Sequence, residues 1–354
     1  LIEFKEVYFR GMTLTEEEMI ELFYFKFTET PLLNRMDAIK DYFIDSWETL
    51  NGRNISDDDQ ETLQMKFDKM YKTKDIYAIY NWMLEDCGCN LLPDVPYEKR
   101  KLPYEDVFPM LYLKYRLSGG NSTHKNIKHL VIDEMQDYSY LQYTILEMLF
   151  HCRMTILGDR AQTLDTKQQD VLRFLPKLLG REIRTIEIKK SYRNTLEIAR
   201  YAEKVSGVSD LELLDRHGKE VVEKTFNTDT ELLDELVCHL KCPGDFETAA
   251  LITTTEEEAF DLSRLLKLRG INVSYVDRNS SAFKKGLTVT TFYLAKGLEF
   301  DQVFALRGAK ENPLKNQAEY ICATRALHEL HIYTNTSLEN ILPQDNSLYT
   351  LIDN

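Results

Sequence analysis

The sequence predicts an α/β protein with a helical region at its amino-terminal end. Residues 1–100 place apolar residues at helical spacing, and from about Leu111 strand-like and helix-like segments alternate. The composition, with 43% hydrophobic and 29% charged residues, is typical of a soluble globular protein. The 354 residues are enough for two or three domains, each with its own core.

The amino-terminal region, residues 1–98, is expected to be helical. "LTEEEMIELFYFKF" opens like a capped helix, with Thr13 or Thr15 ahead of acids and then apolar residues at helical spacing. "PLLNRMDAIKDYFIDSWETL" and "DDDQETLQMKFDKMYKTKDIYAIYNWMLED" continue the same period, and no alternating strand pattern interrupts them. The proline-rich stretch "GCNLLPDVPYEKRKLPYEDV" then indicates a linker into a different region.

Beyond Leu111 the sequence predicts strands separated by helices such as "NTLEIARYAEKV" and "TEEEAFDLSRLLKLRG". This alternation implies largely parallel sheets. The expected strands are Leu130–Asp133, Thr155–Leu157, Thr185–Ile188, Ala249–Thr253, Val273–Val276, Leu287–Thr291, Gln302–Leu306 and Leu330–Tyr333.

The net charge of −14 is unevenly distributed along the chain. Residues 1–100 carry 12 Lys and Arg against 21 Asp and Glu, a balance of −9, and the remaining residues account for −5. An acidic segment is poorly suited to grip a phosphate backbone, which needs Lys and Arg, and it suits a basic surface on another protein. The alternative is an acidic surface without a partner, and charge by itself favours that alternative.

No apolar run approaches the roughly 18 residues of a membrane span, so no membrane contact is expected. No signal peptide is visible, and the six cysteines are scattered, which indicates reduced thiols in the cytoplasm. The pairs Cys87/Cys89 and Cys238/Cys242 lack a second pair at zinc-knuckle spacing. A metal site that uses the nearby His239 is therefore the less favoured interpretation.

Two adjacent acids end the first expected strand. In "HLVIDEMQDYS" three apolar residues run into Asp133-Glu134, which predicts a buried parallel strand that delivers acids to the carboxyl edge of a sheet. In phosphate-handling enzymes the first acid holds Mg²⁺ and its neighbour orients or deprotonates a water. An ordinary acidic strand end is the alternative.

Two further stretches follow expected strands. "TILGDRAQTLD" ends a strand in Gly158-Asp159 and carries Gln162 on the next loop, where a Gln can bond both an attacking water and a phosphate oxygen. "IEIKKSYRNTLEIA" places Arg193 at the start of a helix, where its guanidinium can point toward a phosphate. A polar turn and a capped helix with a surface arginine are the structural alternatives.

The last two stretches lie near the carboxy-terminal end. "TVTTFYLAKGLEFDQVF" places Gly297 and Glu299 in a tight turn between two strands. "YICATRALHELHIY" is a helix that carries Arg325 just before a final strand. A structural role explains either stretch in isolation.

Taken in order, D-E-x-Q-D, G-D-x-x-Q, S-Y-R-N-T, A-K-G-L-E-F and Y-x-x-A-T-R-A closely resemble motifs II to VI of the UvrD/Rep superfamily 1 helicases. The resemblance covers roughly residues 100–335. It implies two RecA-like lobes: part of the first in residues 99–184, with motifs II and III, and all of the second in residues 185–354, with motifs IV to VI.

The resemblance also implies ATP and Mg²⁺ as cofactors, and it assigns roles by position. Asp133 would be the Mg²⁺ ligand, and Glu134 would activate the hydrolytic water. Gln162 would contact that water and the γ-phosphate.

The remaining roles fall in the second lobe. Arg193 and Arg325 would be arginine fingers that contact the phosphates. Gly297 and Glu299 would lie beside the nucleotide, at the cleft between the lobes.

The phosphate-binding loop of the family, G-x-x-G-x-G-K-[ST], precedes the D-E strand, and this sequence contains nothing like it. Gly119-Gly120 lacks a following Gly-Lys-Ser/Thr and lies too close to that strand. We therefore expect this chain to be the carboxy-terminal part of a longer ATPase whose amino-terminal P-loop segment is missing. It should be inactive by itself.

Several positions depart from the unwinding members of the superfamily. Asp165 and Lys167 stand where those members place aromatic residues that stack on single-stranded bases, and Tyr293 replaces a usual histidine. Arg193 and Lys296 are only about a hundred residues apart, which is roughly what one lobe needs. The large insertion of unwinding helicases does not fit between them.

These departures, together with "LPYEDVFPMLYLKYRLSG" and "DRHGKE", look like HelD, a family that uses ATP while it detaches stalled RNA polymerase from nucleic acid. Residues 1–98 would then be an arm, inserted in the first lobe, that enters the polymerase channel. The resemblance implies core RNA polymerase as the partner, and DNA for the intact protein. Two alternatives remain: a conventional UvrD/Rep-type DNA translocase or helicase in DNA repair, and a non-catalytic protein-binding module.

Overall fold

The computed structural model divides into two compact units. The first unit comprises Leu1–Asp133, Tyr138–Leu157 and Val171–Ile183. The second unit comprises Glu134–Asp137, Gly158–Asp170 and Arg184–Asn354. The structure describes residues 1–120, 124, 126–163, 171–180, 183–207, 211–241, 246–280, 285–307, 313–334 and 349–353.

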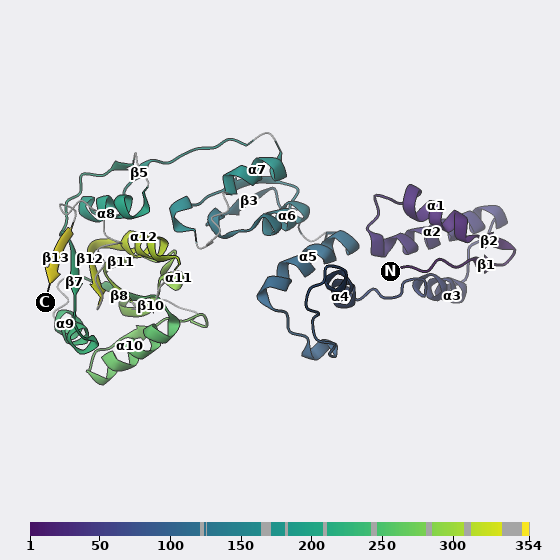
Figure 1. Cartoon of the computed structure of the whole chain (residues 1–354). Helices are drawn as coiled ribbons and strands as arrows, with labels where there is room; N and C mark the ends of the chain where they lie inside the picture. The colour runs from purple at the N-terminus through teal and green to yellow at the C-terminus, as the bar shows by residue number, and fades with distance from the viewer. Residues whose placement is uncertain are drawn as a thin grey trace. The chain divides into compact units, whose positions relative to one another are not determined.

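Helices dominate the first unit, as the sequence predicts for its amino-terminal part. Thr15 is the N-cap of the first helix and forms a capping box with Glu18, which confirms one of the two expected caps. A π-helix, Leu22–Lys26, follows that helix directly. The α-helices of this unit are α1 (Glu16–Glu21), α2 (Arg35–Asn51), α3 (Asp57–Asp68), α4 (Ile76–Asp86), α5 (Tyr104–Ser118), α6 (Tyr140–Leu149) and α7 (Val171–Leu179) (Figure 1).

A hairpin that was not predicted from the sequence precedes the first helix of this region. Strands β1 (Val7–Phe9) and β2 (Met12–Leu14) pair antiparallel. Arg10 and Gly11 connect them, both with positive φ, +44° and +87°. Two-residue hairpin turns of type I′ need positive φ at both positions and usually contain Asn-Gly or Asp-Gly. Because Arg-Gly is an unusual choice, the sequence signal was weak.

Three apolar clusters hold the first unit together. The largest joins the hairpin to α1, α2 and α3 and buries Phe23, Phe43 and Trp47. A second lies around α4. The third packs Tyr143 of α6 and its neighbours against Ile132.

Strands β3 (His129–Ile132) and β4 (Arg153–Ile156) pair in parallel, with Ile132 opposite Ile156. β3 was expected to be parallel and buried. Its direction confirms the first expectation, but its exposure contradicts the second. Val131 is 60% exposed, and Ile132 alone is buried within β3. Among the described residues, no further strand pairs with β3 or β4, so both edges of this two-stranded sheet are open there.

The second unit is built on a seven-stranded sheet in the order β13-β7-β12-β11-β8-β10-β9. Each of its strand pairings is parallel, which confirms the predicted α/β class. A separate short parallel pair consists of β5 (Lys190–Ser191) and β6 (Glu212–Leu213). The sheet strands are β7 (Val221–Thr225), β8 (Thr248–Thr253), β9 (Ser274–Tyr275), β10 (Gly286–Thr291), β11 (Phe300–Arg307), β12 (Ala326–Thr334) and β13 (Tyr349–Asp353).

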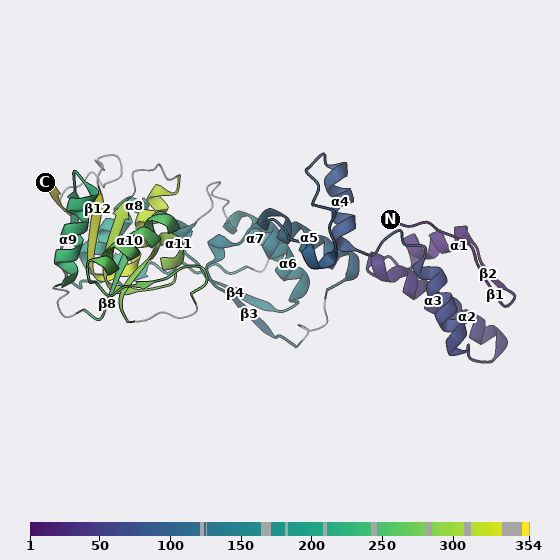
Figure 2. The same cartoon turned by 90° about the horizontal axis from the view of Figure 1, so that it is seen from below.

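Helices cover both faces of this sheet (Figure 1), and Figure 2 views it from the side of α9 and α10. One apolar cluster packs α8 (Leu196–Ser206), α11 (Phe292–Ala295) and α12 (Lys315–Arg325) on one face. The other cluster packs α9 (Asp229–Lys241) and α10 (Glu256–Leu268) on the opposite face. This three-layer arrangement suits a RecA-like lobe.

Some strand predictions were wrong. Thr185–Ile188 is not a strand; Ile186 and Ile188 are 70% and 78% exposed, so no neighbouring strand or helix buries the alternating side chains. β7 was not predicted, because its sequence "VVEKT" combines two apolar residues with three polar ones. Among the described residues, no helix is both long enough and apolar enough to span a bilayer.

Candidate functional site

Two predicted motifs begin at the same edge of the small sheet. Because β3 and β4 are parallel, Asp133-Glu134 and Gly158-Asp159 follow strand ends that lie side by side. The segments Glu134–Asp137 and Gly158–Asp170 then belong to the second unit, whereas Asp133 belongs to the first and is exposed. The structure therefore assembles most of the predicted site residues within the second unit.

Glu134 has a strained backbone. Its φ is +54°, in the left-handed region, which costs a residue with a Cβ roughly 1 kcal/mol or more. Its carboxylate accepts a hydrogen bond of 2.6 Å from Gln136 and lies 3.3 Å from the Lys296 ammonium. Strained residues held by surrounding contacts are concentrated at functional sites, so this geometry marks Glu134 as a candidate.

Gly158 allows the two segments to pack closely. A Cβ at this position would lie 2.4 Å from Gln136 Oε1 and 2.4 Å from Met135 Cγ. The Asp159 amide donates a hydrogen bond of 3.0 Å to the same Gln136 oxygen. Since no side chain fits between these atoms, the glycine of G-D-x-x-Q is required by close approach.

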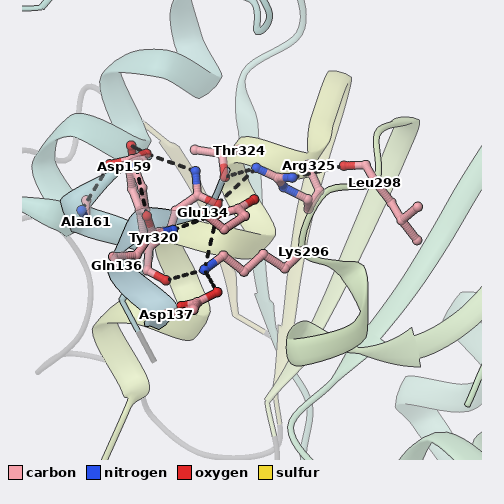
Figure 3. A network of polar contacts seen from close by, with 11 residues as sticks. Glu134, Gln136, Asp137, Asp159, Ala161, Lys296, Leu298, Tyr320, Thr324 and Arg325 are labelled. Carbon is pink, nitrogen blue, oxygen red and sulfur yellow. Dashed lines mark hydrogen bonds and ion pairs between the residues drawn. The ribbon is translucent and has the colours of Figure 1, made fainter. Parts of the chain in front are cut away.

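Lys296 connects the two segments with the turn that follows α11. Its side chain is 7% exposed and donates to Asp137 at 2.6 Å (Figure 3). It also donates to the Gln162 carbonyl at 3.0 Å. Gly297, with φ +80°, allows the chain to turn directly after this lysine. One buried ammonium group thus balances the carboxylates of Asp137 and Glu134.

Asp159 joins motif III to α12. One of its oxygens accepts hydrogen bonds from Gln162 at 2.8 Å and from the Tyr320 hydroxyl at 2.9 Å. Its other oxygen caps the Ala161 amide at 3.0 Å. Burial and the nearby Asp159 charge raise the pKa of Tyr320, so its hydroxyl stays protonated and donates.

Arg325 is the most buried charged group of the site, with 2% of its surface exposed. It donates to the Leu298 carbonyl at 3.1 Å and lies 3.4 Å from Gln162 Oε1 (Figure 3). Its Nε has no hydrogen-bond partner among the described residues. Burial, and then the positive charge of Arg193, lower the pKa of Arg325.

Arg193 and Glu299 form an ion pair of 2.6 Å, and both side chains are nearly half exposed. Asn194 fixes the adjacent backbone by donating to the Ala326 carbonyl at 2.6 Å. The two predicted residues therefore contact each other.

The structure brings Glu134, Gln162 and Arg325 into one polar network: Lys296 contacts Glu134 and the Gln162 carbonyl, and Arg325 contacts the Gln162 side chain. Asp165 and Lys167, which the sequence analysis placed at the base-stacking positions, lie outside the described residues. Sequence reasoning did not assign roles to four residues that hold the network together. All four lie inside the recognised motifs, which is the signal that could have found them: Asp137, Asp159, Lys296 and Tyr320.

The donor set fits the terminal phosphate of a nucleoside triphosphate. Arg325 offers a buried guanidinium whose Nε has no partner among the described residues. Gln162 offers an amide, and Glu134 offers a carboxylate within the same network. A guanidinium stabilises charge on a transferred phosphoryl group, and a carboxylate with an amide orients a water. This combination can serve phosphoryl transfer to water.

The fold and this network define an α/β lobe in which the predicted motif segments meet through polar contacts. Residues 20–164 match the model of the UvrD/REP helicase N-terminal domain. The match includes most of the helical region as well as the first two motifs. It supports a UvrD-like, superfamily 1 helicase-type motor, a class that in general uses a nucleotide and a metal ion and binds nucleic acid.

The chain is similar to many solved structures, including the following two. The C-terminal domain of a possible DNA helicase from Lactobacillus plantarum WCFS1 is 27% identical, with a TM-score of 0.36, over 46% of this chain and 98% of that one. The PRRSV helicase is 15% identical, with a TM-score of 0.37, over 75% of this chain and 47% of that one. None of the curated proteins matches this chain.

Proposed function

We propose that the second unit is the lobe of an ATP-driven, UvrD-like motor that responds to the terminal phosphate. The observation that carries the proposal is the meeting of four separated motifs around Lys296 and Arg325. Motif II supplies Glu134 and Asp137, motif III supplies Gln162, and motifs V and VI supply the lysine and the arginine. A shared network allows a change at the phosphate to be transmitted between these segments.

In this proposal Glu134 activates the attacking water, and Gln162 contacts that water and the γ-phosphate. Arg325 and Arg193 stabilise negative charge on the transferred group. Mg²⁺, when bound, would neutralise charge on the phosphates.

Three residues complete the proposed nucleotide site. Asp133 would hold the Mg²⁺, which prefers carboxylate oxygen. Gly297 and Glu299 would lie beside the nucleotide, and Glu299 would hold Arg193 until ATP binds, since the two now form an ion pair.

The test requires a longer protein that contains a phosphate-binding loop ahead of these residues. Glu134→Gln should abolish ATP turnover while ATP binding is kept, because the amide cannot take a proton from water. Glu147→Gln, at an exposed position on α6, is the matched control and should leave turnover unchanged. Normal turnover by the Glu134 variant would reject the proposed role. The 354-residue chain by itself should show no turnover.

We further propose a HelD-like activity in which the motor releases RNA polymerase from nucleic acid. Support comes from the acidic balance of residues 1–100, which suits a basic protein surface. The proposed division stays as residues 1–98 for the arm, 99–184 for the rest of the first lobe and 185–354 for the second. A conventional DNA translocase is the competing function.

The structure shows which acids to change in testing this partner. Acids in the first turns of α1 and α3 stabilise those helix ends, so their reversal would also affect folding. Glu21, Asp45 and Glu61 are exposed and lie outside the first turns of their helices. Their joint replacement by Lys should weaken retention of core RNA polymerase in a pull-down, and higher salt should weaken it for the unaltered chain.

A fluorescence-anisotropy titration with single-stranded DNA completes the comparison. Weak DNA binding together with polymerase retention supports the HelD-like function. Tight DNA binding with no polymerase retained rejects it and favours the DNA translocase.

A further inference from the structure

A second cluster of ionisable residues lies on the other face of the sheet. Successive side chains of β12 point to opposite faces. Leu330 and Ile332 belong to the apolar cluster beneath α8 and α12. Glu329 and His331 therefore point to the face that α9 and α10 cover, and they are 3% and 7% exposed.

α9 places a third metal-ligating group beside them. The rings of His239 and His331 are 4.8 Å apart between centroids, and Phe304 packs against both rings. One donor atom from each of His239, Glu329 and His331 lies within 4.8 Å of the others. Two imidazoles and one carboxylate from two separate elements thus converge beside the core.

We propose that His239, Glu329 and His331 form a binding site for a divalent transition-metal ion, with Zn²⁺ as the representative. Imidazole nitrogen and carboxylate oxygen are established zinc ligands, and two His with one Glu form a known ligand set. Imidazole donors disfavour Mg²⁺ and Ca²⁺, which prefer oxygen. The ion would tie α9 to the middle of the sheet.

The surroundings of the cluster suit this role. Gln302, opposite Glu329 on β11, donates a hydrogen bond of 2.7 Å to its carboxylate and orients it. Such support of a ligand by a second residue is typical of metal sites. The Nδ1 of His331 is buried and has no hydrogen-bond partner among the described residues.

Lys219 would compete with a metal ion for the Glu329 carboxylate. Its ammonium forms an ion pair with Glu329, although its side chain is 75% exposed. An exposed lysine can leave the carboxylate and become solvated at little cost. Metal binding is therefore expected to displace Lys219, and the lysine should lower the affinity of the site.

An entry route and a small closing movement complete the geometry. Lys219 and Glu329 line a cavity of about 310 Å³, through which an ion can reach the carboxylate. Zinc bonds of about 2.0–2.2 Å bring ligand atoms to about 3.3–3.5 Å from one another. The present separations, up to 4.8 Å, therefore require a movement of about 1.5 Å or less, which side-chain rotation of the half-buried His239 can supply.

The experiment is a titration of the metal-free chain with Zn²⁺ in competition with a chromogenic chelator, together with thermal unfolding with and without Zn²⁺. The unaltered chain should bind one ion and unfold at a higher temperature with it. His239→Phe keeps an aromatic ring against Phe304 and removes one ligand. It should weaken binding about 100-fold or more, whereas Lys219→Met should strengthen it.

Two controls separate this site from other zinc ligands. His328→Gln changes a histidine of the same strand that lines the cavity without belonging to the cluster, and it should leave affinity unchanged. Cys238→Ser, at an exposed neighbour of His239, should also have no effect. Loss of binding in the Cys238 variant, equal affinity of the His239 variant and the unaltered chain, or no stoichiometric binding would each overturn the proposal.

Discussion

The ammonium group of Lys296 donates a hydrogen bond of 2.6 Å to the Asp137 carboxylate, across 159 positions of sequence. The same group lies 3.3 Å from Glu134 and 3.0 Å from the Gln162 carbonyl. A single buried cation therefore sets the positions of three motif residues. Its positive charge also attracts both carboxylates.

Replacing Lys296 by Met should lower the free energy of unfolding by about 1–3 kcal/mol, because two acids lose their shared cation. The acids are about one-third exposed, so water offsets part of the full cost of a broken buried pair. Lys285→Met is the control, since that lysine is 78% exposed and pairs with Glu247 at the surface. Its replacement should cost clearly less than that of Lys296 in urea titrations, because water screens an exposed ion pair. Equal losses would contradict the central role of Lys296.

Glu134→Gly should be more stable than Glu134→Ala by about 1 kcal/mol, because glycine adopts the observed φ of +54° without strain. At Glu147, within α6, the order should reverse, with Gly about 1 kcal/mol less stable than Ala. Thermal unfolding of the four variants measures both differences. If the Ala variant were the more stable one at both positions, Glu134 would carry no backbone strain in solution.

Arg193 and Arg325 should differ in their effect on folding. Arg325→Ala removes a buried group with several hydrogen bonds and should lower the free energy of unfolding by about 1–3 kcal/mol. Arg193→Ala breaks a half-exposed ion pair and should lower it by less than about 1 kcal/mol. In a protein with a phosphate-binding loop, both changes should lower ATP turnover roughly 10³-fold. Arg325→Lys separates the two effects, and near-normal turnover in any of these variants would make that arginine structural.

Glu223 should make stability depend on pH. It is fully buried, both of its oxygens lack a hydrogen-bond partner among the described residues, and Arg307 lies 3.6 Å away. Burial raises its pKa from 4.5 to about 7, against the opposing charge of Arg307. The folded state therefore holds a proton that the unfolded state releases between these pH values, so stability falls as pH rises through this window.

The comparison of Glu223→Gln with the unaltered chain isolates this effect. The variant cannot titrate, so from pH 5 to pH 8 it should gain about 2–3 kcal/mol of stability relative to the unaltered chain. Urea titrations at the two pH values measure the gain. A constant difference would show that Glu223 has an ordinary pKa.

The strong periodic patterns predicted the fold class and most elements of the second unit. β8 and β11 lie where their apolar runs indicated, because buried parallel strands need continuous apolar residues. The weak patterns failed. β7 combines polar with apolar residues, and the β1–β2 hairpin uses Arg-Gly in its turn, so local sequence did not reveal either one.

The sequence by itself determined which residues belong to the motifs, since residue type and spacing within a segment are local properties. Only the tertiary structure decided which of them meet. It placed Lys296 against Asp137 and Glu134, paired Arg193 with Glu299, and gave Glu134 a left-handed backbone. It also brought His239 to Glu329 and His331, whereas the sequence had offered only the neighbouring cysteines as further metal ligands. These relationships depend on strand order and helix packing, which juxtapose residues that are distant in the chain and so leave no local signal in the sequence.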